Sequence, residues 1–129
     1  MKTRVAIAFS VCLLAGGAAS IFAHHSQAAF DLNKQVTIEG VVTQVNWANP
    51  HSLFFVDGRL ASATEGAAQQ WVIEGASVQG LEKVGWTKES AKPGENLTIT
   101  GNPRSDGKRE LLLTSITLSN GKKFSFRPE

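Results

Sequence analysis

Three histidines in this chain could supply nitrogen ligands to a metal ion. His24 and His25 are adjacent near the N-terminus, and His51 ends a turn-forming Asn-Pro-His sequence. Imidazole nitrogen is a ligand that copper, zinc and nickel bind well. The spacing alone does not bring the three rings together, so the question is which elements position them.

The two N-terminal histidines follow a segment that has the three parts of a secretory signal peptide. Residues 1–23 begin with basic side chains, continue with an apolar run over residues 5–14, and end in small residues before Ala23. We expect cleavage after Ala23, with Ala19 or Ser20 as alternative sites and an uncleaved anchor as a further alternative. The chain is therefore expected in the periplasm or outside the cell, with no membrane contact once the signal is removed.

Cleavage after Ala23 would make His24 the N-terminal residue. Its α-amine and ring could then chelate one metal ion, and His51 could complete a three-nitrogen site for copper(II). We predict a metal site of His24, His25 and His51, with copper first and zinc as the alternative. Glu74 or Asp31 could add an oxygen ligand or a hydrogen bond to a ligand. Solvated N-terminal histidines and a purely structural His51 are the competing interpretation.

Composition narrows the class of protein further. The 129 residues carry a net charge of +2 and one cysteine, Cys12, which lies inside the apolar run. Removing the signal leaves about 106 residues, the size of one domain, with as many basic as acidic side chains. This balance argues against nucleic acid as a partner, and the absence of a mature cysteine excludes thiol catalysis and thiolate metal sites.

The pattern of apolar residues predicts an arm, several strands and one helix. Residues 24–34 form the arm, with Phe30 and Leu32 as its apolar anchors, and residues 35–129 form the domain. The strands are expected at Gln35–Trp47, His51–Asp57, Gln70–Gly75, Leu97–Gly101, Glu110–Leu118 and around Phe124 and Phe126. A short helix is expected over Ser77–Gly85, capped by Ser77.

Glycine and proline mark the bends between these elements. The apolar positions of the first strand change parity at Gly40, which predicts a β-bulge there. Residues 58–68 are expected to form a loose loop. Lys92–Glu95 fits a type II turn, and Asn120-Gly121 fits a hairpin turn.

The order of three strands, one helix and two strands, with an extra hairpin, is that of the OB-fold. We therefore expect an all-β domain with one short helix, built as a small, partly open OB-fold-like barrel of five to six antiparallel strands. A β-sandwich is the main alternative, which the single helix between the third and fourth strands disfavours.

Several motifs together resemble a family of small exported bacterial proteins of unknown function. These are Ala23-His24-His25-Ser26, a strand ending in Trp47-Ala48-Asn49-Pro50-His51, Trp71-Val72-Ile73-Glu74, Gly85-Trp86 and Pro93-Gly94. The resemblance covers nearly the whole mature domain and departs from the family at the helix start, Ser77-Val78-Gln79. It implies export and a shared site, but no reaction.

A second candidate site uses the aromatic residues of the barrel face, where OB-folds stack bases or sugars. Its predicted ligand-binding residues are Trp47, Asn49, Trp71, Glu74 and Arg104. The alternative is that these tryptophans, with Trp86, fill the core, as a small barrel requires.

We expect a binding protein rather than an enzyme, because Ser26, His51 and Asp57 show no triad spacing. The partner would be a metal ion, a small ligand or another periplasmic protein. Three hypotheses stay open: a metal-binding protein, a metal-independent ligand- or protein-binding module, and an enzyme such as a copper oxidase.

Overall fold

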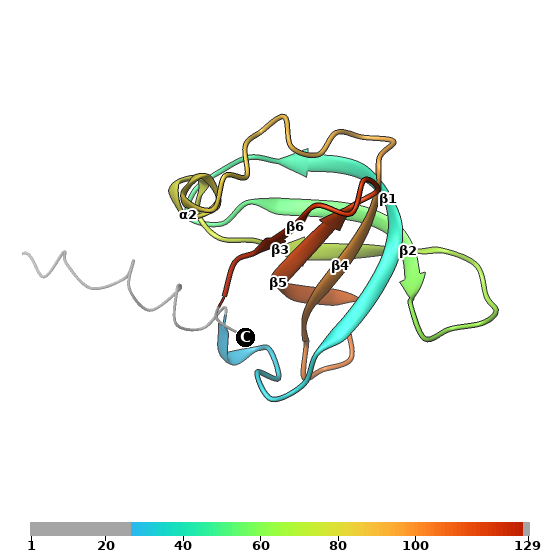
Figure 1. Cartoon of the computed structure of the whole chain (residues 1–129). Coiled ribbons are helices and arrows are strands. Elements are labelled where there is room, and N and C mark those ends of the chain that lie inside the picture. The colour runs from blue at the N-terminus through green and yellow to red at the C-terminus, as the bar shows by residue number, and fades with distance from the viewer. Residues whose placement is uncertain (1–26, 128–129) are drawn as a thin grey trace, which may run out of the picture.

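The computed structural model of the protein describes residues 27–127, which fold into six strands and one α-helix (Figure 1). In chain order these are β1 (Val36–Asn46), β2 (Leu53–Leu60), β3 (Gln69–Glu74), α2 (Val78–Lys83), β4 (Asn96–Pro103), β5 (Glu110–Leu118) and β6 (Lys123–Ser125). No helix within this part of the chain is both long and apolar enough to cross a membrane. The predicted signal peptide lies outside the described residues.

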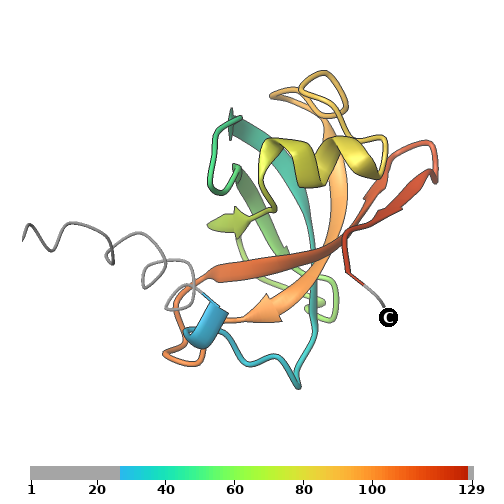
Figure 2. The same ribbon diagram turned by 90° about the vertical axis from the view of Figure 1, so that its left-hand side faces the viewer.

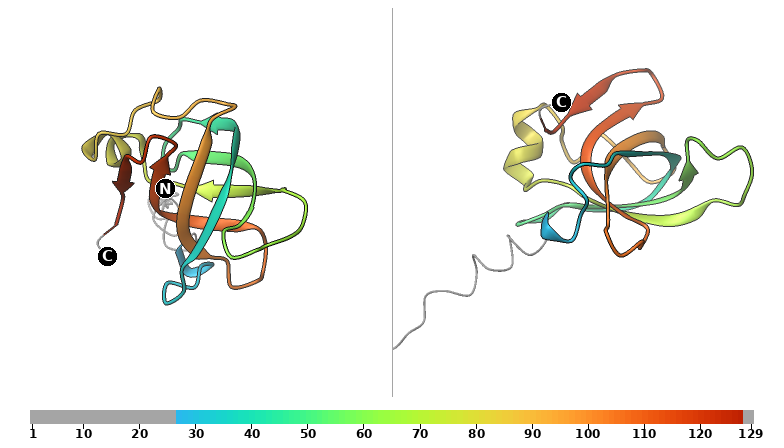
Figure 3. Two further views of the ribbon diagram at one scale, coloured as in Figure 1. Left: turned by 45° about the vertical axis from the view of Figure 1, so that its right-hand side comes forward. Right: turned by 90° about the horizontal axis from the view of Figure 1, so that it is seen from below.

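The strands form one sheet that closes on itself. Their order is β3-β2-β1-β4-β5-β6, and β3 also pairs with β5, so the first five strands make a barrel that β6 extends (Figures 1 and 3). This arrangement confirms the predicted small OB-like all-β fold. It differs in one respect, because β3 and β5 run parallel, with Val72 opposite Glu110 and Glu74 opposite Leu112. The connection through α2 and β4 is long enough for a parallel pairing.

The bend in β1 lies further along the strand than expected. The register shifts between Val42 and Gln44, and the positions that face the core change there from even to odd. The bulge predicted at Gly40 was therefore wrong. Gly40 instead lies opposite Gly58, where a Cβ would come within 2.4 Å of the Asp57 carbonyl oxygen. Glycine serves close contact between two strands here, not a bulge.

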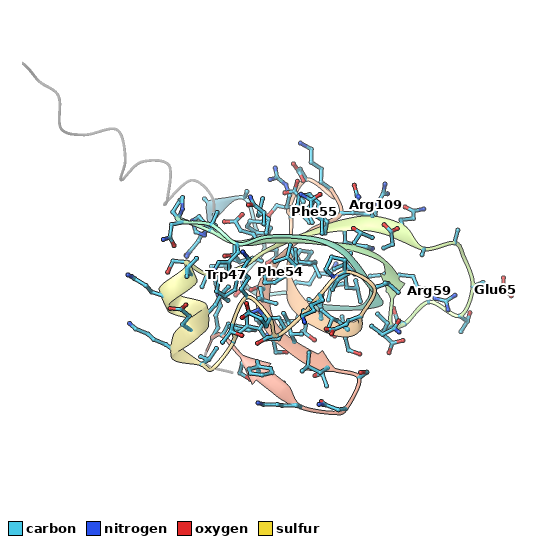
Figure 4. All side chains as sticks on the ribbon, turned by 90° about the horizontal axis from the view of Figure 1, so that it is seen from above. Trp47, Phe54, Phe55, Arg59, Glu65 and Arg109 are labelled. Carbon is cyan, nitrogen blue, oxygen red and sulfur yellow. The ribbon has the colours of Figure 1, made fainter. Side chains whose placement is uncertain are left out.

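The core is centred on Trp86, which is 1% exposed. Its indole makes edge-to-face contacts with the rings of Phe54, Phe124 and Phe126, at centroid distances of 6.0, 5.0 and 6.0 Å. Figure 4 shows the alternation of β2, with Phe54 within the barrel and its neighbour Phe55 on the outer side. The helix and β6 therefore cover one end of the barrel through a single aromatic cluster.

The turns follow the predicted chemistry more closely than the strand ends do. The Glu95 amide donates to the Lys92 carbonyl at 3.1 Å, and Gly94 has φ +94°, as a type II turn requires. Ser77 caps α2, because its Oγ accepts from the Gly80 amide at 3.2 Å. By contrast β2 continues through Leu60, so the β2–β3 loop is shorter than predicted; Figure 4 shows Arg59 and Glu65 at its two sides.

The described part of the arm, residues 27–34, packs against the β4–β5 loop (Figure 2). Phe30 is 5% exposed and forms a β-bridge with Arg104, whose guanidinium carbon lies 6.0 Å from the ring centroid. The Asp31 amide donates to the Pro103 carbonyl at 2.8 Å, and the Ser105 amide donates to the Ala29 carbonyl at 2.9 Å. Phe30 is thus an anchor, as predicted.

The second predicted anchor of the arm was wrong. Leu32 is 53% exposed, and only its backbone is held. The side chain of Asn102 is buried and donates to the Lys34 carbonyl at 2.7 Å and to the Leu32 carbonyl at 3.4 Å. A polar side chain therefore fixes this end of the arm, because the backbone there leaves two carbonyl groups that need donors.

Candidate functional site

The turn between β1 and β2 places His51 at the barrel end near the helix. Ser52 is fully buried, and its hydroxyl donates to the Ala48 carbonyl at 3.2 Å. Asn49, in the same turn, accepts a hydrogen bond from the Val78 amide at 3.0 Å through its side-chain oxygen, and its bond to the next proline is cis. The turn is therefore tied to the first residue of α2, and Asn49 has a structural role in that link.

The structure brings His51 and Glu74 together. The Nδ1 atom of His51 lies 3.4 Å from Glu74 Oε1 and 3.3 Å from the carbonyl oxygen of Gly75. Both side chains are partly exposed, 28% for His51 and 18% for Glu74. Because both neighbours of Nδ1 are acceptors, the proton of the neutral ring belongs on Nδ1, which leaves the lone pair on Nε2.

His51 and Glu74 line a pocket of about 380 Å³ at the β3–β5 seam. Part of its wall is apolar and comes from Leu112 of β5 and from Phe126 beyond β6. Gln27, the first described residue of the arm, also lines this pocket. The arm that packs on the β4–β5 loop therefore leads back to His51.

The other two predicted metal ligands, His24 and His25, lie outside the described residues. Within residues 27–127, no group of three or more His, Cys, Asp or Glu side chains is close enough to hold a metal ion. A metal site at His51 would therefore need further ligands from outside residues 27–127.

The predicted aromatic ligand-binding residues are partly buried and pack against the core. Trp47 and Trp71 both contact the core cluster, and the Trp71 indole N–H donates to the Gly58 carbonyl at 3.2 Å. Trp71 also lines a separate cavity of about 390 Å³ beside Arg59 and Arg109. Neither tryptophan lines the pocket of His51.

Arg104 belongs to a network of ion pairs on the β4–β5 loop. Its guanidinium donates to Asp106 at 3.0 and 2.7 Å and to Glu110 at 3.0 Å. The hydrogen bonds from Arg104 lower the pKa of Asp106 well below its ordinary value, and those to Asp106 raise the pKa of Arg104 further. Arg104 holds the loop that the arm packs on, and it does not line the pocket of His51.

Sequence reasoning missed Gln27 and Asn102. Gln27 carries no signal of its own, since one glutamine in a polar arm is ordinary. Asn102 could have been noticed, because a side-chain amide at the end of an apolar strand, next to Pro103, often donates a hydrogen bond to a backbone carbonyl.

Comparison with curated proteins and with solved structures gives no match. The profile of a family described as a family of unknown function, DUF6152, matches residues 11–113. Those residues include the β1–β2 turn, Glu74 and most of the barrel, so the match spans the candidate site. The chain therefore belongs to this family of unknown function.

Proposed function

We propose that this protein is an exported metal-binding protein that holds copper(II) with His24, His25 and His51. The observation that carries the proposal is the placement of His51. Its Nδ1 faces two acceptors, and its pocket is lined by Gln27, which follows the two N-terminal histidines by two and three positions. Zinc is the alternative metal.

The contacts of His51 suit a metal ligand. In metal sites, the ligating imidazole usually donates its other N–H to a carboxylate or a backbone carbonyl, which fixes the tautomer and raises the basicity of the ligating nitrogen. Here Glu74 and the Gly75 carbonyl are those acceptors. Nε2 would be the ligand, and the Glu74 carboxylate would offset part of the charge of the cation.

The N-terminal histidines are close enough in sequence to reach this pocket. Consecutive Cα atoms are about 3.8 Å apart, so the Cα of His25 lies within about 8 Å of that of Gln27, and the Cα of His24 within about 11 Å. Cleavage after Ala23 would add the α-amine to the imidazoles. A set of nitrogen ligands without thiolate favours copper(II) or zinc over softer copper(I).

The test is a copper(II) titration of exported protein whose N-terminus has been established by intact mass. Isothermal titration calorimetry against a competing chelator gives affinity and stoichiometry, and electron paramagnetic resonance reports nitrogen ligands. We expect one ion per chain. His51→Ala should weaken binding at least tenfold and change the nitrogen hyperfine pattern, and Glu74→Gln should weaken it about tenfold or more. Glu89→Gln is the matched control, because Glu89 is an exposed carboxylate outside the pocket.

Equal affinity in wild type and His51→Ala would refute the proposal. It would favour the metal-independent binding module, whose ligand affinity would not depend on His51. If the N-terminus is Ser20 and copper binding is unchanged, the His24 α-amine is not a ligand. The three imidazoles remain candidates in that case, and His24→Ala and His25→Ala test them.

A further inference from the structure

A second groove lies on the outer face of β1, β4, β5 and β6. It has a volume of about 500 Å³. Five of its lining residues carry hydroxyl groups and two are cations, among them Thr37, Thr100, Ser115, Ser125, Lys123 and Arg127. We call this the hydroxyl groove. Of these residues, Arg127 alone also lines the His51 pocket.

The strand registers explain why the hydroxyls gather there. Thr37 lies opposite Thr100, Thr100 opposite Ser115, and Ser115 opposite Ser125. Four neighbouring strands thus present one hydroxyl each in a single row, about 4.8 Å apart from strand to strand. The Thr37 and Thr100 hydroxyls are hydrogen-bonded to each other at 2.9 Å, so this pair is already oriented.

The charge of the hydroxyl groove has one sign among its lining residues. Within residues 27–127, Lys123 and Arg127 are the charged residues that line the groove, and none of the other lining residues is a carboxylate or an apolar side chain. Lys123 begins β6, and Arg127 lies two residues beyond its end. Such a surface suits a ligand with many hydroxyls and separated anionic groups rather than an aromatic or apolar ligand.

The geometry points to the hydroxyl groove as a binding site for an acidic oligosaccharide, independent of the metal site. The row of serine and threonine hydroxyls can both donate to and accept from sugar hydroxyls. Lys123 and Arg127 bind the acidic groups through charge-assisted hydrogen bonds. A single inorganic anion could use the cations but not the row of hydroxyls, whereas a chain of sugar acids can use both.

The test uses the metal-free protein and three probes: a galacturonic acid tetrasaccharide, a neutral maltotetraose and inorganic phosphate. Binding is followed by amide chemical shifts in NMR spectra and by calorimetry. We expect the acidic tetrasaccharide to bind at least tenfold more tightly than the other two probes, with shifts concentrated on β4, β5 and β6. The double variant Lys123→Ala/Arg127→Ala should weaken its binding at least tenfold. The double variant Lys88→Ala/Lys92→Ala removes the same charge from exposed sites outside the groove and should bind normally.

Removal of single hydroxyl groups tests whether the serine and threonine row contributes to sugar binding. Ser125→Ala, at an exposed position, should weaken tetrasaccharide binding a few-fold and leave the fold intact, and the isosteric Thr100→Val should act similarly. Equal binding of the acidic and neutral tetrasaccharides, equal binding of phosphate, or equal losses in both double variants would overturn the assignment. Copper binding in the single variant Lys123→Ala should stay unchanged, since Lys123 lines the hydroxyl groove and not the His51 pocket.

Discussion

Asn102 provides the sharpest test of how the arm is held on the barrel. Its side chain is 4% exposed, and its amide donates to the Lys34 carbonyl at 2.7 Å and to the Leu32 carbonyl at 3.4 Å. Asn102→Ala removes both donors and leaves the carbonyls without them. A lost hydrogen bond of this kind, together with the desolvated acceptor it leaves, destabilises a protein by about 1–2 kcal/mol. The 3.4 Å bond adds little, because hydrogen bonds weaken at that length.

Urea unfolding followed by tryptophan fluorescence measures this change, and Asn96→Ala is the matched control. Asn96 lies on the same strand but is exposed, so its removal should change the free energy of unfolding by less than about 0.5 kcal/mol. Hydrogen exchange should rise at residues 29–34 in Asn102→Ala and not in Asn96→Ala, because the amides of Asp31 and Lys34 lie in the segment that Asn102 secures.

A second substitution separates loss of a donor from loss of volume. Asn102→Asp keeps the size of the side chain but places a carboxylate against two carbonyl oxygens, so it should destabilise more than Asn102→Ala at pH 7. Burial raises the pKa of such a carboxyl in the folded state, so the excess destabilisation should shrink as the pH falls. If Asn102→Ala unfolds like wild type, or if Asp is tolerated better than Ala, the arm is not held through these two bonds.

Three further predictions concern the core, the strand pair and the β4–β5 loop. Trp86→Ala should lower the free energy of unfolding by about 3–5 kcal/mol in urea titrations, since its indole joins three phenylalanine rings; a change below about 1 kcal/mol would contradict its central place. Gly40→Ala should destabilise through the contact of its new Cβ with the Asp57 carbonyl, whereas wild-type stability would show that the two strands can separate freely. Because Arg104 lowers the pKa of Asp106 in the folded state, Asp106 stabilises the fold above about pH 4, and this contribution is lost as the pH falls below that value. The stability difference between wild type and Asp106→Asn should therefore shrink below about pH 4, and a carboxyl that titrates near its ordinary value in NMR would refute the coupling.

Local rules predicted the elements of the barrel because each depends on neighbours in sequence. The apolar stretch of Glu110–Leu118 predicted both ends of β5, and Pro93-Gly94 predicted a turn with the observed positive φ. The parallel pairing of β3 with β5 was not predictable in the same way, since it depends on where the chain places β5 after α2 and β4. Apolar periodicity indicates which face of a strand is buried, but it does not indicate which other strand lies beside that strand.

Non-local contacts account for the failures. Val41 is apolar and follows Gly40, so a parity change was predicted there, whereas Val42 continues the core and the change comes between Val42 and Gln44. Leu32 looked like an anchor because it is apolar, but the barrel offers that stretch of the arm an amide from Asn102 instead. In both cases a residue distant in sequence decides the outcome.

The candidate site was predictable only in part. The sequence singled out His51 and Glu74, and the structure places the His51 ring against the Glu74 carboxylate. Nothing in the sequence indicated that the Gly75 carbonyl also faces Nδ1 or that Gln27 lines the same pocket, because both contacts join segments that are distant in sequence. The remaining two histidines lie outside the described residues and stay a prediction.

In the proposed copper site, arm docking and metal binding would be linked, yet substitutions in the two should have separate effects. If the metal binds only when the arm is docked, the apparent dissociation constant equals the intrinsic one divided by the docked fraction. An arm held by the buried Phe30 ring, two backbone hydrogen bonds and the Asn102 amide stays docked nearly all the time unless its docking free energy falls to about 1 kcal/mol. Loss of Asn102 should therefore raise hydrogen exchange in the arm long before it weakens copper binding, whereas loss of His51 should weaken copper binding without loosening the arm.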